Sequence, residues 1–251
     1  MNASKGRSES SLHELVFARP DFCRDRRGGV PEVVMAQGKT VAQCMAIVEA
    51  FLERTGRAIL SLVPAEVEKA LAEAYGRDGF EWHEASRMAI VRREGYTVAP
   101  TGGRVGILTA GTSDQPIAEQ AAIVCREMGC EVCLAHDVGV AGLHRLVEPL
   151  RRFLEDRDVD AIIVAAGMDG ALPSVVSGLV AVPVIGLPTS VGYGMGGKGK
   201  AALLSMLQTC SPGLAVVNVD NGVGAGAVAA LIANRVAAAR ARRRAGDDRG
   251  E

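Results

Sequence analysis

Residues 105–110 read VGILTA, and four further short runs follow along the chain: EVCLAHD (131–137), DAIIVAA (160–166), VPVIGLP (182–188) and LAVVNVD (214–220). Each run is nearly all apolar, as is typical of parallel strands that helices cover on both faces. The stretches between the runs are compatible with the helical crossovers that parallel pairing requires. The sequence therefore predicts an α/β fold built on a doubly wound, five-stranded parallel sheet.

A small α/β module is predicted before this sheet. Thr40 and Gln43 have the spacing of a capping box and precede a stretch with helical periodicity. AILSLV (58–63) has the pattern of a buried strand. A second helix is expected over residues 64–76, because proline suits a first helical turn and glycine commonly ends a helix.

Changes in composition predict four segments. They are an irregular N-terminal segment (1–37), the small α/β module (38–100), the domain of the parallel sheet (101–240) and a charged tail (241–251).

Composition limits the classes of function. The chain has 251 residues, 48% of them hydrophobic, so it can bury a core. Its 28 basic and 29 acidic side chains give a net charge of −1, which argues against a nucleic-acid partner. We find no membrane span and no secretory signal, and six cysteines are too few for a disulfide scaffold, so we expect a cytoplasmic protein with reduced thiols.

Candidate functional residues follow the predicted strands, because ligands of doubly wound sheets bind beyond the carboxyl ends of the strands. GTSD (111–114) follows the first run, and its side chains suit either a helix cap or a phosphate site. His144 and Arg145 come after the second run, as a candidate proton shuttle and a candidate anion ligand. Asp169 follows the third run and is either a cap or a carboxylate that binds metal or substrate.

Two further candidate features lie on either side of the helix predicted between the fourth and fifth runs: a glycine-rich loop before it and Cys210 after it. The loop at residues 192–199 is rich in glycine, but Gly199 stands where a P-loop carries serine or threonine, so a P-loop NTPase is excluded. Close approach of the loop backbone to a ligand remains open. Cys210 lies just before the fifth run, and is either a small buried apolar residue or a reactive thiol.

The order of these motifs resembles the phosphoribosylaminoimidazole carboxylase family, from about residue 104 to 236. The resemblance rests on GTSD, HR (144–145), AAGMDGALPSVVSG (165–178), VPVIGLP and NVDNGVGAG (218–226). It implies a flavodoxin-like sheet and an enzyme that acts on nucleotides and CO2.

A closer resemblance is to the pyridinium-3,5-biscarboxylic acid mononucleotide synthases of nickel-pincer cofactor biosynthesis, the LarB family. It adds DRRG (25–28), PEVVMAQGKT (31–40) and PTSVGYG (188–194). The purine enzymes carry a histidine within GAAHLP where this chain has Ala171 in GALP, which argues against the purine reaction.

This resemblance implies carboxylation of nicotinic acid adenine dinucleotide at C5 of its pyridinium ring, with hydrolysis of the phosphoanhydride to release AMP. Cys210 matches the nucleophile that would add to the ring, and His144 or Asp114 would act as the base with Ser113 as a hydrogen-bonding partner. Mg²⁺ at Asp169 would neutralise the phosphates, and CO2 or bicarbonate would be the co-substrate.

The expected substrate contacts are carried over from the same motifs. They are Gly111, Thr112, Arg145, Gly167, Met168, Asp169, Gly170, Pro188, Thr189, Ser190, Gly192, Tyr193, Gly194, Asn218, Asp220, Asn221, Gly222, Arg26, Arg27 and Lys39. A homo-oligomer, tetramer or octamer, is implied as well. Two alternatives stay open: an aminoimidazole ribonucleotide carboxylase or mutase, and a non-catalytic nucleotide-binding module on the same fold.

Overall fold

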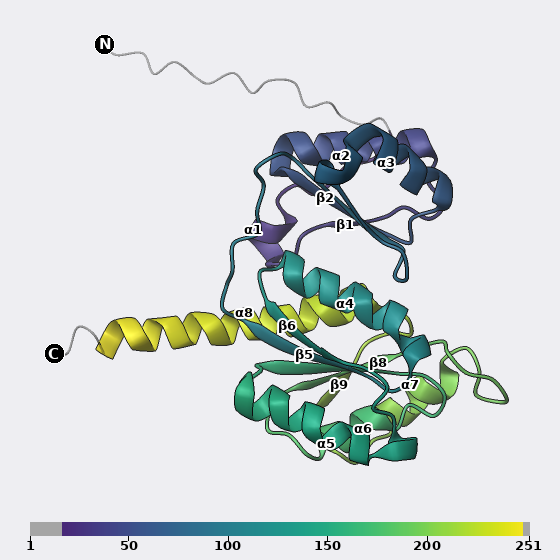
Figure 1. Ribbon diagram of the computed structural model, residues 1–251, viewed down its shortest axis with the longest axis vertical. Coiled ribbons are helices and arrows are strands. Elements are labelled where there is room, and N and C mark those ends of the chain that lie inside the picture. Colours follow the sequence, from purple (N-terminus) through teal and green to yellow (C-terminus); the bar gives the residue numbers. More distant parts are fainter. Residues whose placement is uncertain (1–16, 248–251) are drawn as a thin grey trace, which may run out of the picture.

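A computed structural model of the chain describes residues 17–247. Two sheets are stacked with a pair of long helices between them (Figure 1). Of the predicted segments, residues 1–16 and 248–251 lie outside the described residues, so the predicted absence of a signal at the N-terminus and the last part of the charged tail are untested.

The N-terminal module contains a four-stranded sheet in the order β1-β2-β4-β3. Its strands are β1 (Val33–Met35), β2 (Arg57–Ser61), β3 (Phe80–His83) and β4 (Met88–Arg92). Helices α2 (Val41–Thr55) and α3 (Ala65–Gly79) cover one face, and α1 (Arg24–Gly28) precedes β1. Strand β1 pairs with β2 in parallel, whereas β4 runs antiparallel to both of its neighbours.

The predicted capping box begins α2. The Gln43 backbone N–H donates to the Thr40 hydroxyl over 3.2 Å, and the Thr40 N–H donates to the Gln43 side-chain oxygen over 3.0 Å. The helix ends at Gly56 with φ +80°, where a side chain would also come within 2.8 Å of the Tyr96 ring. Both ends of this helix are therefore encoded locally, and the prediction is confirmed.

Three predictions for the module need correction. Residues 1–37 are not irregular throughout, because β1 lies there and pairs with β2. Pro64 is the extended N-cap of α3 and not part of its first turn, although the helix is interrupted at Gly76 (φ +61°) as expected. The hairpin of β3 and β4 was not predicted. Strand β3 is short and alternates apolar with polar residues, and the apolar run of β4 was not used as a signal.

The second sheet confirms the predicted parallel fold. Its strands are β5 (Arg104–Thr109), β6 (Glu131–Ala135), β7 (Ala161–Ala166), β8 (Val184–Pro188) and β9 (Leu214–Val216). They pair in the order β6-β5-β7-β8-β9, and every pair is parallel. Each strand falls within one of the five predicted runs or one residue from it, with β9 shorter than its run.

Helices cover both faces of this sheet (Figure 1). One face packs against α4 (Gln115–Glu127) and α8 (Gly222–Asp247). The other packs against α5 (His144–Arg151), α6 (Leu172–Ser177) and α7 (Lys200–Leu207). Because α8 continues to Asp247, the predicted tail is helical over its first residues and is not a separate segment.

One of the three hydrophobic clusters contains residues of both sheets. Ile59 and Ile90 of the module belong to the same buried cluster as Ala121 of α4 and Ala229 of α8. The module is therefore packed onto the helices that cover the larger sheet, and it is not a loosely tethered attachment.

A buried ion-pair network joins the module to the end of α4. The Glu127 carboxylate, 4% exposed, accepts a hydrogen bond of 2.6 Å from the Arg57 guanidinium and another from that of Arg92. Arg57 also donates to the Glu127 carbonyl oxygen over 2.7 Å, and Arg92 donates to Glu81 over 2.5 Å. Every charge in this contact therefore has an opposite partner.

Among the described helices, only α8 is long and apolar enough, by those two criteria alone, to cross a membrane. Its alanines at positions 225, 229, 230 and 233 are buried in the core that it shares with α4. The core role accounts for its composition, and nothing else in residues 17–247 points to a membrane.

Candidate active site

A cavity of about 530 Å³ opens beyond the carboxyl ends of β5, β6 and β7. This is the point where the strand order reverses, since β6 lies on one side of β5 and β7 on the other. The polar side chains in its wall are Ser113, Asp114, Asp137, Arg145 and Asp169. The apolar part of the wall is formed by Val140, Met168, Ala171, Leu172 and Val191.

Asp114 is the most buried carboxylate of the cavity, with 3% of its surface exposed. It ends the turn after β5 and precedes α4. Its Oδ2 accepts a hydrogen bond of 2.8 Å from the Gly111 backbone N–H, and its Oδ1 accepts one of 2.6 Å from the Thr189 hydroxyl. The carboxylate thus closes the turn of residues 111–114 and forms part of the cavity wall, but its side chain does not cap α4. The phosphate site at GTSD stays a prediction.

Arg145 provides the guanidinium of the cavity. Its Nη1 donates to Oδ2 of Asp137 over 2.6 Å, and Asp137 in turn donates its backbone N–H to the Thr109 hydroxyl over 3.2 Å. Asp137 was not predicted as a site residue. It adopts φ +57°, a conformation that brings its carboxylate to Arg145 and that no local sequence pattern announces.

The charges of the wall are unbalanced, because three carboxylates face one guanidinium. Asp169 is exposed, and its Oδ1 accepts only a long bond of 3.4 Å from the Ala171 N–H. Within residues 17–247, no three His, Cys, Asp or Glu side chains are grouped so as to hold a metal ion. Asp169 by itself supplies one ligand, so Mg²⁺ would bind here only together with phosphate oxygens of a substrate.

Comparison with known families assigns both parts of the chain. The AIR carboxylase family profile matches residues 104–246, which is more than half of the chain. The chain belongs to the AIR carboxylase family. A second profile, of the LarB/PurE-like N-terminal domain, matches residues 12–93 and so covers the module.

Relatives of this AIR carboxylase family member include proteins named N5-carboxyaminoimidazole ribonucleotide mutase. An uncharacterized protein of Methanocaldococcus jannaschii is 44% identical over 85% of this chain and 82% of its own length. The N5-carboxyaminoimidazole ribonucleotide mutase of Thermotoga maritima is 31% identical over 51% of this chain and 74% of its own length. A crystal structure of a PurE2 variant from Treponema denticola is 22% identical over 59% of this chain and 96% of that one, with a TM-score of 0.40.

Within the AIR carboxylase domain, the structure brings part of the predicted site together. The predicted residues that line the cavity are Gly111, Ser113, Asp114, Arg145, Gly167, Met168 and Asp169. His144, which is exposed at the start of α5, does not line it. Thr112, Gly170 and Pro188 are also outside the wall, and Thr189 lies buried behind it.

The glycine-rich loop adjoins the cavity at one end only. A side chain at Gly192 would come within 3.3 Å of the Met168 backbone, which explains glycine there. Beyond it, Tyr193 is 83% exposed, and neither Tyr193 nor Gly194 lines the cavity. The predicted substrate contacts of these two residues are therefore not made within the wall of this chain.

The predicted residues after β9 have structural roles in this chain. The Ser190 N–H donates to Asp220 over 2.8 Å, and the Asn218 side chain accepts from the next backbone N–H over 2.9 Å. Asn221 caps α8 by accepting from the Gly224 N–H over 2.9 Å. A side chain at Gly222 would collide with the backbone of α4. None of the four positions from Asn218 to Gly222 in the prediction lines the cavity.

Cys210 lies at the opposite edge of the sheet from the cavity. It precedes β9, and the carbonyl of Gly213 accepts a hydrogen bond of 3.1 Å from Val184, the first residue of β8. Crossing one five-residue strand covers about 16 Å. The exposed thiol of Cys210 and the cavity of the same chain are therefore far apart. Helix α7 ends at Leu207, and Cys210 is exposed in the loop after it, so it is not the buried apolar residue that was one of the two alternatives.

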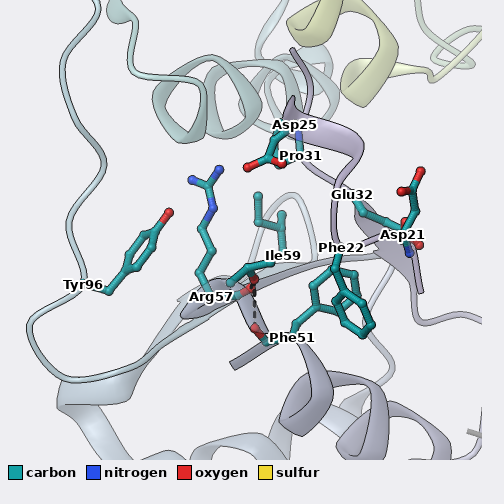
Figure 2. A pocket seen from close by; sticks show the side chains of 10 residues that line it. Asp21, Phe22, Asp25, Pro31, Glu32, Phe51, Arg57, Ile59 and Tyr96 are labelled. Atoms are coloured by element: carbon teal, nitrogen blue, oxygen red, sulfur yellow. Dashed lines mark hydrogen bonds between the residues drawn. The ribbon is translucent and has the colours of Figure 1, made fainter. Parts of the chain in front are cut away.

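The predicted contacts Arg26, Arg27 and Lys39 belong to the module and not to the cavity. Arg27 forms an ion pair of 2.5 Å with Asp21, and Lys39 donates to a backbone carbonyl over 2.7 Å. A small crevice between the N-terminal segment and β2 is shown in Figure 2, where Asp25 points toward Arg57. Its volume of about 40 Å³ has room for only a few water molecules, which is too small for a dinucleotide substrate.

Alkylation with iodoacetamide at pH 8 is expected to separate the cysteines into two classes. Burial raises the pKa of Cys125 far above its usual range and that of Cys130 to about 11, so both remain thiols in the native protein. Cys23 and Cys210 are exposed. Peptide mass spectrometry should find label on Cys23 and Cys210 in native protein, and on Cys125 and Cys130 only after denaturation. Rapid native labelling of Cys125 would contradict the packing described here.

Proposed function

We propose that this protein carboxylates the pyridinium ring of nicotinic acid adenine dinucleotide at C5 and hydrolyses the phosphoanhydride. The products are pyridinium-3,5-biscarboxylic acid mononucleotide and AMP. The observation that carries the proposal is the cavity wall, in which three carboxylates and one guanidinium surround an apolar surface that includes Ala171. The match of the module to the LarB/PurE-like N-terminal domain supports it.

The charge of the wall favours a cationic ring. A pyridinium carries a positive charge, whereas an aminoimidazole ring is neutral, and the excess of carboxylates stabilises the former. Ala171 gives the wall a methyl group where the purine enzymes resembled by this chain have histidine, which argues against the purine reaction. Arg145, held by Asp137, is placed to bind a carboxylate or phosphate of the substrate.

The ring must first be made electron-rich, because a pyridinium carbon does not attack CO2. In the proposed reaction, a cysteine thiolate adds to C4 and converts the ring into a dihydropyridine, whose C5 acts as an enamine carbon. C5 attacks CO2, the proton on C5 passes to a base, and the electrons of that C–H bond return to the ring as the C4–S bond breaks. The thiolate is regenerated, so no oxidant or reductant is needed.

Asp114 is our choice for the base. It is buried, it lines the cavity and its orientation is fixed by two hydrogen bonds, whereas the alternative, His144, lies outside the wall. Ser113 beside it is available as a hydrogen-bonding partner. For the anhydride step, Asp169 would hold Mg²⁺, which would neutralise charge on the substrate phosphates. The co-substrate is CO2 or bicarbonate.

The thiolate is proposed to come from a second copy of the chain. Cys210 lies across the sheet from the cavity of its own chain, so within one chain it cannot reach the ring. The surface near Cys210 carries three exposed leucines, at positions 179, 204 and 207, that a second copy would cover. A cytoplasmic homo-oligomer, tetramer or octamer, is therefore part of the proposal.

The test is mass spectrometry of the products after incubation of the purified protein with nicotinic acid adenine dinucleotide, bicarbonate and Mg²⁺. Equal amounts of the dicarboxylated mononucleotide and AMP are expected. The second candidate is N5-carboxyaminoimidazole ribonucleotide mutase activity, which the names of several relatives favour. Turnover of that ribonucleotide, with none of the dinucleotide, would reject the first proposal. Ligand binding without any turnover would favour a non-catalytic module.

A further inference from the structure

Thr189 forms the second support of the Asp114 carboxylate. It follows β8, is fully buried, and donates its hydroxyl to Oδ1 of Asp114 over 2.6 Å. Its backbone N–H donates to the carbonyl of Ala166, the last residue of β7, over 3.1 Å. Sequence motifs predicted that Thr189 contacts the substrate, but a side chain with no exposed surface does not.

The position of the Thr189 hydroxyl is fixed by its surroundings. A side chain at Gly167 would come within 2.8 Å of the hydroxyl oxygen and 2.3 Å of the Val191 carbonyl oxygen. Glycine at position 167 therefore leaves the space that this oxygen occupies. A threonine side chain is also stiff about χ1, so its hydroxyl is held in one direction.

Each oxygen of Asp114 has one donor, and the carboxylate retains lone pairs for the cavity. The donors are the Gly111 N–H on Oδ2 and the Thr189 hydroxyl on Oδ1. An ionised carboxylate has about four lone-pair sites, so these two bonds leave acceptor capacity where Asp114 lines the wall. The other charged groups of the wall are Asp137, Asp169 and Arg145, and the one cation among them is paired with Asp137.

We infer that Thr189 is a positioning residue, which orients the Asp114 carboxylate for proton transfer and affects turnover only through Asp114. The identity of the reaction rests on the proposed function, whereas the hydrogen bond and its geometry do not. Thr189 joins the end of β8 to the turn after β5, two strands away in the sheet. A base built in this way stays aimed at the ring when the cavity is empty.

The first experiment replaces the hydroxyl by a methyl group. Thr189→Val should lower kcat with nicotinic acid adenine dinucleotide by about tenfold or more, since misplacing a general base loses part of its 10²–10⁴-fold effect. KM should change by less than about twofold, because the hydroxyl does not touch the substrate. Thr189→Ser restores the donor and should recover most of kcat. Thr55→Val, which removes a hydroxyl bonded to backbone carbonyls in the module, is the matched control with unchanged turnover.

A double-mutant cycle separates positioning from a general structural effect. If Thr189 acts through Asp114, Thr189→Val should cause no further loss of turnover in the Asp114→Ala background. A further tenfold loss there, or failure of Thr189→Ser to restore kcat, would overturn the inference. The inference would also be overturned if the two substitutions were non-additive in the free energy of unfolding by urea while Thr189→Val left kcat unchanged. That result would show that Thr189 has a role in folding alone.

The cycle also distinguishes failure of the inference from failure of the proposed function. If the unmodified protein does not carboxylate the dinucleotide, the proposed function is wrong, and the same cycle is measured with N5-carboxyaminoimidazole ribonucleotide. Loss and rescue of kcat with that substrate would still support the positioning role. Absence of turnover with both substrates would overturn it together with the proposed function.

Discussion

Replacing Cys210 by alanine is expected to lower the rate of carboxylation by about a thousandfold or more, as loss of a nucleophile does in other covalent enzymes. Without sulfur addition, C5 of the pyridinium stays electron-poor and has no route to CO2. The measurement is the rate of appearance of the dicarboxylated mononucleotide by mass spectrometry. Cys23→Ala is the matched control, because Cys23 is also an exposed thiol but lies beside α1 of the module. Carboxylation by Cys210→Ala at the normal rate would rule out this nucleophile.

Mixed oligomers test where the thiol comes from. Cys210→Ala and Asp114→Ala are each expected to keep only a small residual turnover alone, about a thousandfold below normal for Cys210→Ala and 10²–10⁴-fold below for Asp114→Ala. If sulfur and base come from different copies, co-assembled subunits regain activity, because some sites combine an intact Cys210 with an intact Asp114. Random mixing of equal amounts would restore about a quarter of the sites. If both residues of a site came from one chain, no mixture would exceed this residual turnover, and the exchange between copies would be rejected.

Replacing Glu127 by alanine is expected to lower the free energy of unfolding by about 3–5 kcal/mol, the usual cost of leaving a buried charge without its partner. Arg57, with 11% of its side chain exposed, loses the carboxylate that it pairs with, and Arg92 loses one of two. Urea unfolding followed by circular dichroism measures the whole chain. The single tryptophan, Trp82 in β3, reports on the module by fluorescence.

Glu131→Ala is the control for this prediction. Glu131 pairs with Arg157 over 3.0 Å, but both side chains are more than half exposed, so its loss should cost less than about 1 kcal/mol. Similar effects of the two substitutions would show that the Glu127 network contributes no more than a surface pair. If Trp82 fluorescence changed at a lower urea concentration than circular dichroism, the module would unfold or detach before the larger sheet unfolds.

The parallel sheet could be predicted from the sequence because each strand is a short apolar run between crossovers, and the carboxyl ends of such strands define one edge. Asp114 and Arg145 follow from that rule, and the structure places both in the cavity wall. The same rule already separates Cys210 from them. Cys210 precedes a strand instead of following one, so the order of the motifs along the chain already predicts that it lies at the opposite edge of the sheet.

Other features depend on contacts between distant residues and have no local pattern. The pair of Arg57 and Glu127 joins residues 70 positions apart, and the bond of Thr189 to Asp114 spans 75 positions. A polar residue at a strand end can either contact a ligand or be buried behind the site. The sequence alone does not tell these two roles of Thr189 apart. Strand β1 has three residues and gains its stability by pairing with β2, so periodicity over its own length was too short to reveal it.

Helix α4 connects the two halves of the molecule mechanically. Asp114 immediately precedes this helix. Its last residue, Glu127, forms ion pairs with Arg57 and Arg92 of the module. The thirteen residues of α4 contact both parts of the molecule. One side of the helix packs on the larger sheet, and another side packs against the module. A fragment that began near residue 104 would uncover an apolar face and would be prone to aggregate. The module is therefore an outer layer of the parallel-sheet domain, and dividing the chain at the linker would divide the hydrophobic cluster to which both parts contribute.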